Sequence, residues 1–243
     1  DPHAPILLMN CKMEIMDETL CGKLHLYALL APHIKGTGKD NSAWCCNLAG
    51  RKFIEAQRVD IDMSFGCLPS FKRRSVGYVG TSDGWQDLMD NFQMDWEFSK
   101  VENGNIAAMG EIDLTANGEF TLGVAFGHTS QSACAHLVQS LAIPFTAQRK
   151  KYVEQWQRAS TAMDSHDLKK DGGSQLRLSQ CVLLAHEDKI FQGSFVASLS
   201  IPWGETKDDL NLIFIAGNEP YTQGNVSYKE ASKLAHQNNV TVN

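Results

Sequence analysis

Residues 95–127, DWEFSKVENGNIAAMGEIDLTANGEFTLGVAFG, decide the fold, because apolar and polar side chains alternate on both sides of two Asn-Gly pairs. At the end of this stretch every second residue is apolar, from Phe120 through Leu122 and Val124 to Phe126. A period of two places these side chains on one face of an extended chain. The pattern therefore predicts a strand at Glu119–Gly127 with one face in a core.

The two Asn-Gly pairs, Asn103-Gly104 and Asn117-Gly118, predict the turns between the strands. Both central residues of a type I′ turn need positive φ, which Asn and Gly tolerate better than other residues. We therefore expect a hairpin of Asp95–Val101 with Asn105–Leu114, which the second turn connects to the third strand.

The same texture extends back to the N-terminus. In residues 23–30 the side chains of Leu24, Leu26, Ala28 and Leu30 share one face, and further turn signals occur at Ala49-Gly50 and Asp83-Gly84. Short alternating strands joined by glycine turns favour an antiparallel β-sandwich over a parallel sheet. We expect this mainly β domain to occupy residues 1–145.

Helical patterns replace the alternation after Ser130. Residues 132–141 predict a short helix that ends before Pro144, and residues 148–159 carry apolar side chains at helical spacing. The polar, glycine-ended run 164–173 predicts a linker, so residues 146–173 are expected to form a linker helix and its connection. A further helix is predicted at Leu176–His186.

The C-terminal residues have a different pattern. Residues 210–217 form a continuous apolar run without alternation, typical of a strand that is covered on both faces. A helix is expected at Ser227–Gln237 and the start of another strand follows it. Residues 210–243 therefore predict a β-α-β unit, separated from the rest near Asp208-Asp209.

Composition and charge exclude several functional classes. The chain has 243 residues with 22 Lys and Arg against 28 Asp and Glu, so its net charge is −6. A nucleic-acid partner is not expected, because such proteins need a basic face. The longest apolar runs are too short to span a bilayer, so no membrane partner is expected either. The sequence opens without Met or a signal peptide, and we expect it to be an excised or truncated piece.

Seven cysteines are spread along the chain without a Cys-x-x-Cys pair. This spacing does not support a zinc knuckle or a thioredoxin motif. Unpaired, buried thiols in a reducing compartment are the simplest interpretation, and this predicts a cytoplasmic protein.

Motifs for cofactors and catalysis give little support. The Gly36–Lys39 run lacks the first glycine and the final Ser or Thr of a phosphate-binding loop. The eight histidines have no metal-ligand spacing, so neither a metal nor another cofactor is expected. No Gly-x-Ser-x-Gly elbow is present. The acidic residues around Glu187 and Glu205 are interpreted as a solvated surface.

Tryptophans give a softer signal for carbohydrate. Trp44, Trp85 and Trp203 are candidate platforms for sugar rings, whereas Trp96 is expected in the core because it lies in an alternating stretch. Trp203 stands between Pro202 and Gly204 in a predicted loop, where packing explains it less well.

Several longer motifs occur in the order in which one enzyme family carries them. They are Leu183–Lys189, Val196–Glu205, Leu24–His33, Asn41–Trp44, Ser75–Gly80 and Ser82–Asp87. On these residues the chain resembles glycoside hydrolase family 15 of the bacterial glucoamylase and glucodextranase type, over residues 1 to about 209. The resemblance implies an N-terminal β-sandwich followed by the start of an (α/α)6 barrel at 174–209.

The resemblance also implies a function. Family members hydrolyse α-glucosidic bonds of glucans from the non-reducing end with inversion, so an α-glucan or oligosaccharide is the expected partner. Trp203 and Ser200 are the expected substrate-binding residues. The two catalytic glutamates and the Trp-Thr-Arg-Asp sugar clamp do not occur here, since Asp208-Asp209 runs into the apolar stretch at Leu210. This chain alone is therefore expected to be inactive, with no catalytic residue assigned.

Residues 210–243 resemble a fragment of a von Willebrand factor A-type domain, although the Asp-x-Ser-x-Ser stretch that holds Mg²⁺ in such domains does not occur. Three hypotheses thus stay open from the sequence. The chain is a fragment of a glucoamylase-like hydrolase, a non-catalytic carbohydrate-binding or domain-stabilising β-sandwich, or an A-type adhesion module.

Overall fold

The computed structural model describes residues 4–48, 50–114, 117–161 and 172–187. The chain divides into two compact units, residues 1–155 and 156–243. The predicted β-α-β unit at 210–243 and nearly all of the predicted linker at 164–173 lie outside the described residues.

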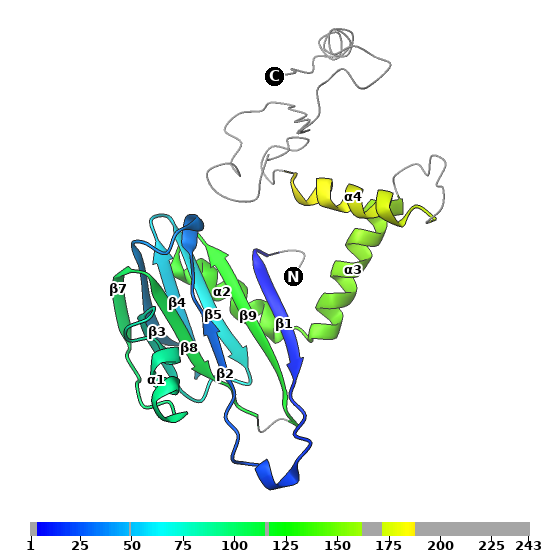
Figure 1. The fold of residues 1–243 in the computed structure, drawn as a ribbon. Helices are drawn as coiled ribbons and strands as arrows, with labels where there is room; N and C mark the ends of the chain where they lie inside the picture. The colour runs from blue at the N-terminus through cyan, green and yellow to red at the C-terminus, as the bar shows by residue number, and fades with distance from the viewer. Residues whose placement is uncertain (1–3, 49, 115–116, 162–171, 188–243) are drawn as a thin grey trace, which may run out of the picture. The chain divides into compact units, whose positions relative to one another are not determined.

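A six-stranded antiparallel sheet forms the larger layer of the first unit (Figure 1). Its strand order is β1-β9-β5-β4-β3-β7, so each of the two edge strands, β1 and β7, pairs with a strand that is far from it in the sequence. The strands are β1 (Ile6–Lys12), β3 (Asn41–Leu48), β4 (Arg51–Arg58), β5 (Ile61–Leu68), β7 (Lys100–Gly104) and β9 (Glu119–Gly127).

A three-stranded antiparallel sheet packs on part of this layer. Its order is β2-β8-β6, with β2 (Tyr27–Leu30), β8 (Ile106–Glu111) and β6 (Arg74–Tyr78). Side chains from both sheets meet in the main core, among them Ile54, Phe65, Val76 and Ile106, together with Phe71 from the connection between β5 and β6. The predicted mainly β, antiparallel sandwich is confirmed.

Helix α2 (Ser130–Ala142) covers the other face of the six-stranded sheet (Figure 1). Thr129 begins it with a capping box, in which Thr129 and Ser132 exchange side-chain to backbone hydrogen bonds. Its apolar side packs on Phe53 and Ala125 through Leu137 and Leu141. Ile143 is extended because it precedes Pro144, which ends the helix as predicted.

The remaining helices are short or lie after the sandwich. Helix α1 (Gly84–Asn91) and the one-turn helices η1 (Glu18–Leu20) and η2 (Ile34–Gly36) occur between strands. Helix α3 (Phe145–Thr161) contains the predicted 148–159 segment, and α4 (Ser174–Ala185) matches the predicted Leu176–His186. Both helix predictions are confirmed.

The predicted hairpin of Asp95–Val101 with Asn105–Leu114 is wrong. Strand β7 pairs with β3 in the large sheet, whereas β8 pairs with β2 and β6 in the small one. Asn103 and Asn117 both adopt positive φ, 54° in each case, but of the two following glycines only Gly118 does, with φ 72°. The predicted type I′ conformation is therefore not formed at Asn103-Gly104, which ends β7. The chain passes from the large sheet to the small one after β7, and back again after β8. This places β8 in the small sheet, where every one of its residues is buried, as expected for a strand that is covered on both faces.

Two further local predictions need correction. Residues 95–99 form no strand, because side chains of Asp87 and Ser75 bind the backbone N–H groups of Asp95, Trp96 and Phe98. Asp83-Gly84 begins α1 instead of forming a hairpin turn.

The alternating segment at 23–30 is a strand only from Tyr27. Leu26, Ala28 and Leu30 pack against the core as expected, but Leu24 is 40% exposed. All seven cysteines are unpaired, as predicted, but only Cys67 and Cys134 are buried, so the expectation of buried thiols is wrong for the other five. Within the part of the chain that the structure describes, no helix is long and apolar enough to cross a bilayer.

Candidate functional site

The sequence-predicted tryptophans fall in different places. Trp203 and Ser200 lie outside the described residues. Trp44 is half-buried on β3, opposite Glu55 of β4, and Trp96 is half-buried with its ring 5.8 Å from that of Phe98. Trp85, on α1, is 58% exposed. Of the described tryptophans, Trp85 therefore fits the role of a binding platform best.

Helix α1 turns a polar side inward and an apolar side outward. Asp83 caps its N-terminus by accepting hydrogen bonds from the backbone of Trp85 and Gln86 at 2.8 and 3.1 Å. Gly84 and Asp87 are buried, and a side chain at Gly84 would overlap Met109 of β8. A surface helix normally buries its apolar stripe, so α1 reverses the usual arrangement.

The outward stripe of α1 consists of three large residues. Trp85, Met89 and Phe92 are 58%, 62% and 85% exposed, and their spacing of four and three residues places them on one side of the helix. Phe92 adopts the left-handed conformation at the C-cap, with φ 62°, a position that usually favours Gly or Asn. Packing of the sandwich core explains none of these three side chains.

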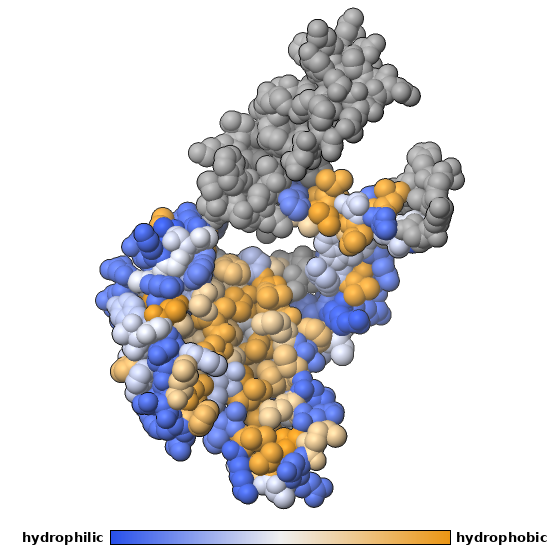
Figure 2. Space-filling view, viewed as in Figure 1, coloured by the Kyte–Doolittle hydropathy of each residue, from blue (hydrophilic) through white to orange (hydrophobic). Residues whose placement is uncertain are grey.

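A cleft of about 580 Å³ lies between this stripe and the chain that leads into β2. Its size is within the range of about 300–1,000 Å³ that is usual for small-molecule sites. In the space-filling view, apolar and charged residues lie side by side around α1 (Figure 2). The lining residues are Lys23, Leu24, His25, Tyr27, Trp85, Leu88, Met89 and Phe92.

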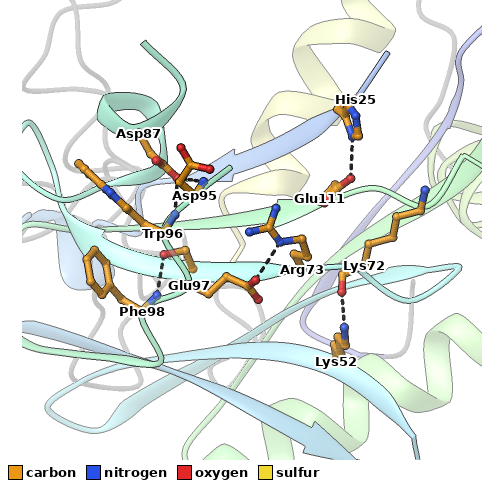
Figure 3. Close-up of polar contacts among 11 residues, drawn as sticks. His25, Lys52, Lys72, Arg73, Asp87, Asp95, Trp96, Glu97, Phe98 and Glu111 are labelled. Carbon is orange, nitrogen blue, oxygen red and sulfur yellow. Dashed lines mark hydrogen bonds and ion pairs between the residues drawn. The ribbon is translucent and has the colours of Figure 1, made fainter. Parts of the chain in front are cut away.

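A buried carboxylate orients the histidine of this cleft (Figure 3). Glu111, 5% exposed at the end of β8, lies with its Oε1 2.9 Å from Nδ1 of His25. The imidazole also stacks on Tyr27, with ring centroids 6.4 Å apart and planes 20° from parallel. Burial, and then the charge of Glu111, raise the pKa of the Tyr27 hydroxyl. His25 is thus held from two sides.

Asp87 fixes the segment that runs behind α1. Its Oδ2 accepts hydrogen bonds from the backbone N–H groups of Asp95 and Trp96, both at 2.9 Å (Figure 3). Arg73 Nε donates to Glu97 Oε1 at 2.8 Å in the same region. The carboxylates of Asp87 and Glu97 therefore already have partners within the protein, and they act as structural supports.

The cleft offers aromatic and hydrogen-bonding groups. It combines an exposed indole, an oriented imidazole and one ammonium group, and the buried carboxylates Glu111 and Asp87 already bind protein groups. Within the described ranges no three His, Cys, Asp or Glu side chains come together to hold a metal ion.

Reasoning from the sequence missed His25 and Glu111. They are 86 residues apart and meet only because β2 pairs with β8. A glutamate at the end of the otherwise uncharged run 106–111 was the one available signal, since a buried carboxylate needs a partner.

Residues 1–160 match the family described as glucodextranase, domain N. The chain belongs to this family. The glucodextranase domain N match covers the whole sandwich and α2, and it confirms the resemblance to glucoamylase-type enzymes that the sequence motifs predicted.

Relatives of this glucodextranase domain N chain are much longer. A glucoamylase of Clostridium sp. (strain G0005) is 29% identical over 208 residues, which cover 84% of this chain and 29% of the relative. A bacterial glucoamylase crystallised in complex with acarbose aligns with a TM-score of 0.74 and 29% identity, over 82% of this chain and 29% of the other. The chain therefore spans about 29% of the length of either protein.

Proposed function

We propose that the chain is the N-terminal part of a glucoamylase-like glycoside hydrolase that acts on α-glucosidic bonds of glucans. The observation that carries this proposal is the match to the glucodextranase N domain across residues 1–160. A glucoamylase relative and a glucoamylase–acarbose crystal structure support it at 29% identity each. By family resemblance the parent reaction is exo-acting and inverting.

We further propose that this chain alone does not hydrolyse glucans. Inverting hydrolysis needs an acid and a base carboxyl about 6.5–9.5 Å apart with a water between them. Three of the buried carboxylates of the described sandwich have other partners: Asp87 binds backbone N–H groups, Glu111 binds His25, and Glu55 binds hydroxyl groups. They therefore support the cleft and the sheets and are not free to activate water.

The partner and the compartment complete the proposal. The expected partner is an α-glucan or oligosaccharide, with Trp203 and Ser200 as substrate contacts in the resembling stretch. Seven free thiols favour a reducing compartment, and we propose the cytoplasm on that basis.

Glucose release from maltose and isomaltose tests the proposal. The purified chain is expected to release no glucose above the buffer blank. Turnover that persists through purification and disappears in Glu187→Gln or Glu205→Gln would refute the proposal of an inactive chain. A matched variant, Asp90→Asn, changes an exposed carboxylate of α1 and serves as the control.

A further inference from the structure

The outward stripe of α1 is the feature of the sandwich that its own core leaves unexplained. Trp85 is exposed although it stands beside the buried Gly84, and Met89 and Phe92 extend the same side of the helix. These three residues form one wall of the cleft, and the segment from Lys23 to Tyr27 forms the other.

We propose that this cleft binds an α-linked gluco-oligosaccharide, with Trp85 as the stacking platform and His25 as the hydrogen-bonding group. The choice of an α-linked glucan rests on the proposed function. The site is separate from the predicted contacts Trp203 and Ser200, and its role is to hold the glucan without acting on it.

The apolar wall fits one side of a pyranose ring. The C–H groups of a glucose unit form an apolar face, and an indole offers a flat apolar surface with a polar N–H at its edge. Trp85 exposes more than half of its surface, and Tyr27 lines the same cleft. A cleft of about 580 Å³ has room for a short oligosaccharide, since ligand sites usually measure about 300–1,000 Å³.

The polar wall fits the hydroxyl groups at the rim of the ring. Because Nδ1 of His25 faces Glu111, the other ring nitrogen, Nε2, has no partner among the described residues and is left for a ligand. Glu111 and the stacking on Tyr27 fix the orientation of the imidazole, which lowers the entropy lost on binding. Lys23, at the same wall, offers a second donor.

The surrounding charge disfavours anionic ligands. Burial raises the pKa of Tyr27 in the cleft, and Glu111 and Asp87 lie close enough for their charges to raise it further. Arg73 acts in the opposite sense, but it is paired with Glu97. Lys23 is the single Lys or Arg in the described lining, and the chain carries a net charge of −6. A phosphorylated ligand would meet this negative field. A neutral oligosaccharide would not, and it uses both the aromatic and the hydrogen-bonding wall.

Calorimetric titration of the full chain with maltoheptaose tests the proposal. We expect saturable binding that weakens by about tenfold or more in Trp85→Ala, since loss of a stacking platform is a change of this order. Trp85→Phe is expected to retain part of the affinity, and His25→Ala to weaken binding as well. Phe98→Ala is the matched control, because Phe98 is also exposed but does not line the cleft.

Each other outcome overturns the proposal. It is overturned if the chain shows a normal thermal melt but does not bind maltoheptaose. It is also overturned if wild type and Trp85→Ala bind maltoheptaose with equal affinity, or if cellohexaose binds as well as maltoheptaose. Self-association that Trp85→Ala abolishes, without maltoheptaose binding, would assign the cleft to a protein partner instead. Glucose measured in the same samples keeps the two proposals apart: glucose release refutes the proposed inactivity, whereas missing binding without release refutes the glucan site alone.

Discussion

Replacing Asp87 by Ala should destabilise the first unit more than any exposed acidic substitution on the same helix. Asp87 is 2% exposed, and its Oδ2 accepts two backbone hydrogen bonds at 2.9 Å, from Asp95 and Trp96. Without the carboxylate, the segment 95–99 has no acceptor at this point to hold it against α1.

The magnitude follows from the two lost hydrogen bonds. A hydrogen bond to a charged group contributes about 1.5–3 kcal/mol. Asp95 is exposed, so its N–H can bind water in the variant, whereas Trp96 is half-buried. We therefore expect a value near the lower end of the sum, a loss of about 3 kcal/mol in the free energy of unfolding. Asp87→Asn retains a neutral acceptor and should lose about 1 kcal/mol.

Urea unfolding followed by circular dichroism measures these differences, provided that the slope m is the same for all variants. Asp90→Ala is the matched control, because Asp90 is exposed near the C-terminus of α1, where a negative charge is mildly unfavourable. The reasoning is refuted if Asp87→Ala and Asp90→Ala unfold at the same urea concentration.

Two further predictions concern the six-stranded sheet. Burial raises the pKa of Glu55 above 4.5 in the folded state, so the folded chain binds more protons than the unfolded one above that pH and loses stability as pH rises towards the raised pKa. Glu55→Gln should therefore gain stability relative to wild type as pH increases from 4.5. A pH-independent difference in urea midpoints would contradict this. In β1, the bonds from Phe126 N to Pro5 O and from Met13 N to Gly118 O show that odd-numbered residues bond to β9. Met9→Pro should then destabilise the chain by about 1 kcal/mol more than Leu8→Pro, whose N–H faces the open edge, and equal melting temperatures would refute this register.

Local patterns in the sequence predicted some strands, such as β9, but not the partners of the strands. The period of two located β9, since alternation depends only on which face of a strand is buried. Positive φ at Asn103 and Asn117 was equally local. The pairing of β7 with β3 could not be predicted from local patterns, because β7 could join either sheet. Only the complete set of buried faces decides which sheet it joins.

The candidate site was harder to predict for a related reason. Trp85 was one of three candidate platforms, because any tryptophan can stack on a sugar ring and is visible in the sequence. The contact between His25 and Glu111 was not visible, since it depends on the register in which Tyr27 lies opposite Glu111. The carboxylate of Asp87 accepts the backbone hydrogen bonds of residues 95–96 that a neighbouring strand would otherwise accept. Such a contact leaves no periodic pattern in the sequence.

Because α1 faces the sandwich with polar residues, ligand binding and stability should depend on different residues of this helix. The buried residues at this helix are Asp83, Gly84 and Asp87, which are polar or small, and Leu88 is half-buried. The attachment of the helix therefore does not use Trp85, Met89 or Phe92. Burial of apolar area is the main favourable term in folding, and Trp85 and Phe92 forgo much of it by remaining exposed. Substitutions in this stripe should therefore change binding with little effect on stability, whereas substitutions of the polar supports should do the reverse. The two groups of variants separate recognition from folding within a single helix of eight residues.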